Sequence, residues 1–284
     1  MGRSFGLLLA AAIVAGASAG AQAADLLPPP PPMEPPPPVD FGGWYLRGDV
    51  GVGFTEISGW RSTLQPAVLG GAVVLPSGPI WQLGHSLDTT AFVGGGIGYQ
   101  FNGWFRGDVT AEYRFAAGYK AGQGYFCPVC FNPVGTDEYN GNVGTALFMA
   151  NGYFDLGTWY GFTPYVGGGV GAAMHNISAV TDYNPVTGGA GFGTTANVTN
   201  FAWAAMAGVS YAVTPNLRLD LGYRYVDMGN VTTGPISCLG APCFRERHSF
   251  NIASNDIRFG FRYLLGGFAP PPVLAPPPPL IRKY

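Results

Sequence analysis

The sequence predicts an all-β fold, a transmembrane β-barrel of eight antiparallel strands, and three observations favour it. The chain has 284 residues, of which 47% are hydrophobic and 11% are charged, against roughly 25% charged residues in an ordinary soluble domain. It begins with the features of an export signal. After that signal, short segments alternate between apolar and polar residues, and no uninterrupted apolar run reaches the ~20 residues of a helical span. Such a chain is typical of a barrel in lipid.

The first 23 residues are interpreted as a signal peptide. Arg3 supplies the positive charge, Phe5–Ala15 form a short apolar segment, and Ala21-Gln22-Ala23 is a cleavage site of the A-x-A type. We therefore expect the mature protein to begin at Ala24. No cysteine follows the cleavage site, which argues against a lipoprotein anchor.

Two proline-rich blocks, Pro28–Pro38 and Pro270–Pro279, flank the middle of the chain. Both are expected to be disordered, extended polyproline spacers. The predicted organisation is a signal peptide (1–23), a proline-rich periplasmic segment (24–40), a barrel (41–265) and a proline-rich C-terminal tail (266–284). The other prolines lie outside the predicted strands, as expected because proline cannot donate to a β-ladder.

Eight segments between the two blocks show the period of two that predicts strands. In the last of them, Ile257, Phe259 and Phe261 alternate with charged residues and glycine. An apolar face against lipid and a polar face towards the lumen is the pattern of a membrane barrel. The segments are Trp44–Phe54, Thr90–Phe101, Trp104–Phe115, Thr145–Leu156, Tyr165–His175, Phe201–Val213, Asn216–Asp227 and Ser254–Leu265.

Short and long connections alternate between these strands. Asn102-Gly103, Gly157–Thr163 and Thr214-Pro215 are short. Outer-membrane barrels have short periplasmic turns and long external loops, so an even strand count places both termini in the periplasm. The apolar patch Val68–Leu75 leaves an alternative of ten strands open. The long loops are expected at Thr55–Thr89, Ala116–Gly144, Asn176–Asn200 and Met228–Ala253.

The strand parity points seven arginines and about seven acidic residues into the lumen. An eight-stranded barrel is just wide enough for side chains to fill it, so these charges predict a compensated ion-pair plug. A narrow ion or proton path is the alternative. By this parity the inward acids also include Asp155, Asp227 and Asp256. The predicted network consists of Arg47, Asp49, Arg106, Asp108, Glu112, Arg114, Arg218, Asp220, Arg224, Arg258 and Arg262.

The four cysteines are predicted to form disulfides, because the chain is exported and their number is even. Local pairs, Cys127 with Cys130 and Cys238 with Cys243, are preferred, and pairing across loops stays open. The three histidines are expected near or in external loops. They do not form a close metal-ligand pair, so we predict no metal site, no cofactor and no catalytic residue.

The first, seventh and last strands resemble those of small OmpA-like outer-membrane barrels, closest to the alphaproteobacterial surface-antigen or porin-family group. The resemblance lies in Gly43-Trp44-Tyr45-Leu46-Arg47-Gly48-Asp49-Val50-Gly51, in Arg218–Tyr225 and in Asp256–Tyr263. The last segment resembles the signal read by the barrel-assembly machinery. Two departures are the nineteen residues after Leu265 and the absence of the peptidoglycan-binding domain of full-length OmpA relatives.

This resemblance implies a structural protein of the outer membrane of Gram-negative bacteria with exposed antigenic loops. The expected function is envelope integrity and surface interaction, and the protein is not expected to be an enzyme. A narrow porin-like channel is the alternative, and a lipid-A-modifying barrel is a third interpretation that rests on fold analogy alone. Expected partners are outer-membrane lipid, lipopolysaccharide, the assembly machinery and, through the tails, peptidoglycan or periplasmic proteins. The net charge of −2 argues against nucleic acid.

Overall fold

The computed structural model describes residues 42–65, 67–69, 72–74, 79–126, 134–186, 188–239 and 245–265. The predicted signal peptide and both proline-rich tails lie outside the described residues. The strands within the described residues are β1 (Gly43–Leu64), β2 (Ala67–Leu69), β3 (Ala72–Val74), β4 (Ile80–Leu87), β5 (Thr90–Gln100), β6 (Phe105–Phe126), β7 (Val134–Asp155), β8 (Phe162–Tyr183), β9 (Ala190–Gly193), β10 (Ala196–Ala212), β11 (Leu217–Thr232), β12 (Ile236–Cys238) and β13 (Glu246–Leu264).

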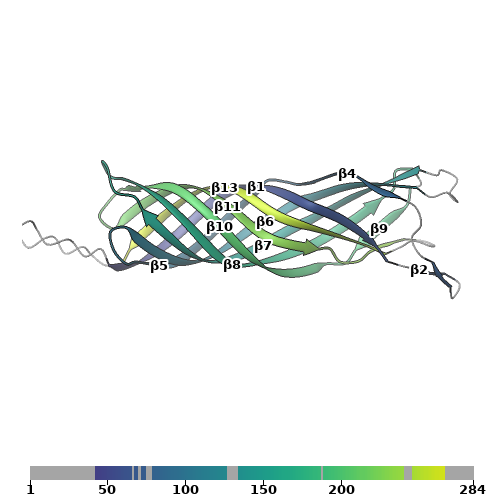
Figure 1. Cartoon of the computed structure of the whole chain (residues 1–284), viewed down its shortest axis with the longest axis horizontal. Helices are drawn as coiled ribbons and strands as arrows, with labels where there is room; N and C mark the ends of the chain where they lie inside the picture. Colours follow the sequence, from purple (N-terminus) through teal and green to yellow (C-terminus); the bar gives the residue numbers. More distant parts are fainter. Residues whose placement is uncertain are drawn as a thin grey trace, which may run out of the picture. The chain divides into compact units, whose positions relative to one another are not determined.

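Eight of these described strands form a closed antiparallel ring in the order β1-β5-β6-β7-β8-β10-β11-β13 (Figure 1). The ring closes because β13 pairs with β1, so that Tyr45 faces Gly98 on one side and Leu264 on the other. Closure satisfies the backbone polar groups internally, as a hydrocarbon environment requires. The predicted eight-stranded antiparallel barrel is confirmed. The patch considered as two further wall strands forms β2 and β3, whose described pairing is with each other.

An apolar belt surrounds the part of the ring next to the short turns. Its side chains point outward from all eight strands and are about half exposed; on β1 they are Trp44, Leu46, Val50, Val52 and Phe54. Surface this apolar is costly in water and favourable against lipid chains. The belt therefore marks the membrane-spanning part. In the described residues no helix is long and apolar enough to cross a bilayer.

The barrel wall continues well beyond the belt. β1, β6, β7 and β8 are each 22 residues long, about twice the ~9–11 residues that a tilted strand needs to cross a membrane. Much of each connection that we expected to be a loop is therefore strand. The prediction of four long loops is wrong in this respect, and we call this extension the upper part of the barrel.

The hydrophobic pattern inverts in the upper part. Tyr119, Tyr139 and Phe250 are buried inside, whereas Lys120 and Asn140 are exposed outside. Water rather than lipid surrounds this region, so polar residues are favoured on the outer face and the interior holds an ordinary apolar core. Register shifts mark the change on several strands, including β1, where Gly59 has a φ of 63°.

β4 forms an incomplete seam in the upper wall. It pairs with β6, while the upper residues of β1 pair with β13. Among the described residues β1 and β4 approach each other without ladder pairing, and a hydrogen bond of 3.2 Å joins His85 Nε2 to the carbonyl oxygen of Ile57. Trp81 and Leu83 on β4 are 39% and 56% exposed. The upper part thus presents an open strand edge with apolar side chains.

Candidate functional site: the charged lumen

Charged side chains fill the lumen inside the belt in three groups. We define the lower group, nearest the short turns, as Arg106, Asp155, Arg218, Asp220 and Arg262. The middle group is Arg47, Asp49, Asp108 and Arg258, and the upper group is Glu112, Arg114, Arg224 and Asp256. Except for Arg218, all of these residues are less than 9% exposed. Alternation along each strand places them inside, opposite the lipid-facing belt.

The middle group is held by a bidentate ion pair. Arg47 donates from Nε and Nη2 to the two carboxylate oxygens of Asp49, both at 2.8 Å, and from Nη1 to Asp108 at 2.6 Å. Arg258 donates to Asp49 at 2.9 Å. Tyr45 donates its hydroxyl to Asp108 at 3.0 Å. Two positive and two negative charges therefore balance within this group.

The upper group is also balanced. Arg224 donates to both oxygens of Glu112 at 2.8 Å and from Nε to Asp256 at 2.8 Å. Arg114 donates to Glu112 at 2.9 Å and also pairs with Asp256. Each carboxylate thus accepts from both arginines. The planar guanidinium suits this arrangement because it can bond two acceptors at once.

The lower group contains three arginines and two aspartates. Arg262 donates to Asp220 at 2.6 Å, and Arg106 donates to Asp155 at 3.1 Å. The Arg106 guanidinium also lies 4.1 Å from the centre of the Tyr153 ring, which favours a cation through the charge distribution of the ring. The Arg218 side chain has no hydrogen bond or ion pair with any described residue. The group therefore carries one positive charge in excess.

Small residues opposite the long side chains make this packing fit. A Cβ atom on Gly98 would lie 2.2 Å from Cζ of Tyr45, whose hydroxyl is fixed at Asp108. Such a distance is shorter than any allowed contact. Glycine is required at this position because the wall must leave space for the ring.

A second polar cluster lies in the upper part, above the three groups. Trp60 donates to the Tyr119 hydroxyl at 2.7 Å, Tyr119 bonds His248 Nδ1 at 3.0 Å, and His248 Nε2 lies 3.1 Å from Glu246. Tyr139 donates to Glu246 at 2.6 Å. Ser62 bonds Glu246 rather than the imidazole. The hydroxyl is therefore not placed for activation by the histidine.

Two further carboxylates lie near Glu246 at the top of the described interior. Burial, together with the charge of Glu246, raises the pKa of Asp137 to about 6, although Asn184 donates to its carboxylate at 2.8 Å. Burial and the charges of Asp137 and Glu246 raise the pKa of Asp182 to about 7. Burial also opposes ionisation of Glu246, but hydrogen bonds from His248, Ser62 and Tyr139 outweigh it and lower that pKa. Among the described residues no group of acids, histidines and cysteines is arranged to hold a metal ion.

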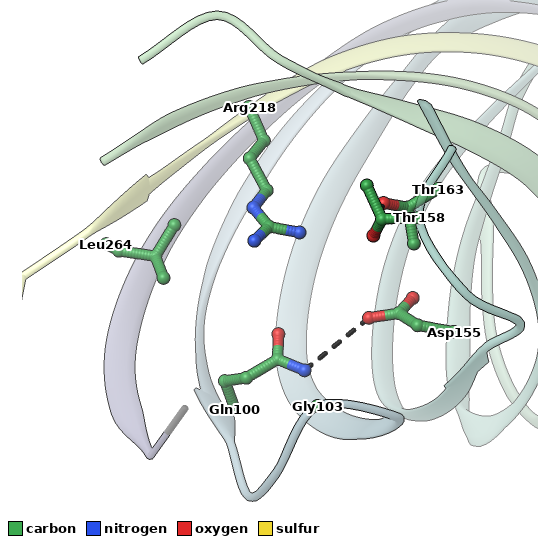
Figure 2. A pocket seen from close by; sticks show the side chains of 7 residues that line it. All are labelled: Gln100, Gly103, Asp155, Thr158, Thr163, Arg218 and Leu264. Atoms are coloured by element: carbon green, nitrogen blue, oxygen red, sulfur yellow. Dashed lines mark hydrogen bonds between the residues drawn. The ribbon is translucent and has the colours of Figure 1, made fainter. Parts of the chain in front are cut away.

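A small cavity opens beside the lower group at the end with the short turns (Figure 2). It has a volume of about 60 Å³ and is lined by Gln100, Gly103, Asp155, Thr158, Thr163, Arg218 and Leu264. Figure 2 shows the Arg218 guanidinium extending from one wall towards the threonines and Asp155 on the other. Gln100 donates to Asp155 at 3.5 Å across the floor.

The structure places all eleven predicted network residues in the lumen and brings ten of them into ion pairs among the described residues. The prediction that Asp227 faces the lumen is wrong, because its side chain lies on the outward face of β11 and accepts a hydrogen bond from Asn251 at 3.1 Å. The expectation that the histidines lie near or in external loops is also wrong for two of them. His175 and His248 lie inside the barrel and are about 1% or less exposed. Cys127, Cys130 and Cys243 lie outside the described residues, and so does the side chain of Cys238.

An apolar belt around a closed antiparallel ring with a charged interior defines the class of outer-membrane β-barrels. A family model described as "Outer membrane protein beta-barrel domain" matches residues 7–238. The chain belongs to this family, and its location is the outer membrane.

Two relatives and one solved structure are similar to this chain. The chain is 32% identical over 229 residues to the outer membrane protein PagN of Salmonella typhimurium, covering 78% of this chain and 89% of PagN. It is 31% identical over 134 residues to a putative adhesin of Rickettsia canadensis, covering 47% of this chain and 57% of the adhesin. The crystal structure of Neisserial surface protein A is similar with a TM-score of 0.44 and 18% identity, covering 78% of this chain and 96% of that protein.

Proposed function

We propose that this protein is a closed structural barrel that contributes to envelope integrity and presents its upper part outside the cell as a contact surface. The observation that carries this proposal is the length of the wall. Strands of 22 residues extend about twice as far as a membrane crossing needs, and the part beyond the belt is strand rather than loop. A rigid wall of this kind holds a binding surface clear of the lipid. That the termini lie in the periplasm is part of the proposal, because short turns face that side in such barrels.

The ion pairs support a closed lumen rather than a diffusion channel. In the middle and upper groups every arginine is paired with a carboxylate, and these side chains are less than 9% exposed. An ion that passed through would have to separate these pairs in a region of low dielectric, which is costly.

The seam at β4 supports the surface contact. Trp81 and Leu83 are exposed beyond the belt, where lipid does not cover them. Exposed apolar groups next to an open strand edge favour contact with another protein. The adhesin-like name of one relative points the same way.

Adhesion of bacteria that display the protein tests this proposal. We expect W81S/L83S to reduce attachment to cultured animal cells severalfold at equal surface amounts. The matched control is L156S/W159S, which changes the same two residue types at the end with the short turns, where Leu156 and Trp159 are 55% and 57% exposed. That control is expected to attach like the wild type. Equal attachment by both double variants and the wild type would contradict the role of the upper seam.

Contact with lipopolysaccharide is part of the same proposal. Arg61 on β1, Arg247 on β13 and Arg245, which directly precedes β13, are exposed in the upper part of the barrel, and no described acid pairs with them. Phosphate groups of the outer leaflet attract such a patch. We expect lipopolysaccharide to raise the unfolding midpoint of the wild type more than that of R61Q/R245Q/R247Q. K120Q, which removes an exposed charge on β6, serves as control, and an equal rise in the triple variant would refute this contact.

A further inference from the structure

Counting charges in the lumen identifies one arginine that the described residues do not neutralise. The charged neighbours of Arg218 are Arg106, Arg262, Asp155 and Asp220. Asp220 is engaged by Arg262 at 2.6 Å, and Asp155 by Arg106 at 3.1 Å. The middle and upper groups are neutral, so they supply no spare carboxylate.

The surroundings of Arg218 form a site for a small ligand rather than a solid wall. Its guanidinium is partly buried and borders the cavity of about 60 Å³ shown in Figure 2. Opposite it lie the hydroxyls of Thr158 and Thr163, which are 2.7 Å apart. One of these hydroxyls can donate to the other and leave a hydrogen free for a ligand.

A second orphan donor lies in the same group. Nη2 of Arg106 is buried without a hydrogen-bond partner in the described residues. Buried donors normally have partners, and leaving one unpaired costs roughly 1–3 kcal/mol. Two arginines of the lower group therefore have capacity for an acceptor.

We propose that this cavity binds a small oxyanion, a carboxylate or phosphate group, on Arg218 at the short-turn mouth of the barrel. The guanidinium binds the anion through its planar pair of N–H groups, and Thr158 and Thr163 add hydroxyl contacts. Asp155 also lines the cavity, but its charge is engaged by Arg106 and Gln100. With the orientation proposed above, the ligand comes from the periplasm.

Arginine side-chain NMR tests the site without reference to any other function. The protein, labelled with ¹⁵N-arginine and refolded in a non-ionic detergent, is titrated with sodium phosphate, with sodium acetate, and with sodium chloride at matched ionic strength. R218K identifies the Arg218 Nε–Hε resonance by its disappearance. We expect that resonance to shift saturably with a millimolar Kd, because so small a ligand makes few contacts. Saturation by phosphate alone or by acetate alone distinguishes the two sources, and either result supports the site.

A variant that keeps Arg218 provides a test that does not depend on whether R218K folds. T158A changes an exposed turn residue. We expect it to raise the Kd for the anion severalfold, while the NMR spectrum remains that of a folded barrel. The chloride titration at matched ionic strength reports non-specific ion effects. No shift at Arg218 with either anion, or a shift that chloride reproduces equally, would overturn the proposal.

Discussion

Replacing Arg224 by methionine tests the energetic role of the upper group. Arg224 is 3% exposed and donates three hydrogen bonds of 2.8 Å, two to Glu112 and one to Asp256. Without it, Arg114 faces both carboxylates alone, and the group carries a buried net charge of −1. Removing one partner of a buried ion pair typically costs about 3–5 kcal/mol. We expect R224M to lower the free energy of unfolding by that amount.

A second substitution then separates the charge effect from lost packing. In R224M/E112Q the group is neutral again, because Arg114 balances Asp256. We expect the double variant to recover about 1–3 kcal/mol relative to R224M, whereas additive losses are expected of independent sites. Unfolding by urea in lipid vesicles, followed by tryptophan fluorescence, measures both. R61M removes an exposed arginine and should change stability by less than about 0.5 kcal/mol. An R224M loss below about 1 kcal/mol, or strict additivity, would refute the reasoning.

Two further predictions concern the wall and the top of the lumen. G98A should lower the free energy of unfolding by about 1–3 kcal/mol or prevent folding, because the added Cβ collides with Tyr45. G43A is the control, since a Cβ there meets nothing within 4 Å and should not change stability in this way. Equal urea midpoints for the two variants would contradict this prediction. The raised pKa values of Asp137 and Asp182, about 6 and 7, predict stability that falls as pH rises from about 5 to 8, since the folded state binds these protons more tightly than the unfolded state. D137N/D182N should flatten that pH dependence, and an unchanged slope in the double variant would count against it.

The membrane-spanning part of the fold could be predicted from the sequence because lipid enforces one simple rule. On β13, Ile257, Phe259 and Phe261 must face hydrocarbon, so the residues between them face the lumen. The same alternation identified the lumen arginines without any knowledge of their partners. Which carboxylate pairs with which arginine depends on register across the barrel, which a single sequence does not reveal.

The upper part could not be predicted in this way because its environment reverses the rule. Tyr119 and Tyr139 are apolar residues that face inward there, and a register shift between Arg114 and Ala117 changes the parity along β6. An alternation signal that inverts and slips over a few residues resembles a loop. For this reason the sequence predicts a loop at His248, although this residue is buried among aromatic rings. The available signal is an apolar residue at each of the alternate positions Ala117, Tyr119 and Ala121, which are buried in the structure.

The error at Asp227 shows what charge counting adds. With Asp227 inside, seven arginines would meet seven acids and no charge would be in excess. Its outward position leaves seven arginines and six acids in the described lumen, and Arg218 without a paired carboxylate. The alternation along β11 places its odd-numbered residues on the outer face, and Asp227 is one of them.

Single-channel recording of the refolded protein in a planar bilayer tests the closed barrel most directly. A heat-dependent shift on gel electrophoresis first establishes that the inserted protein is folded. The paired lumen predicts a silent bilayer at ordinary voltages. Steady discrete openings from folded protein would contradict the closed barrel and show that the lumen charges line a path.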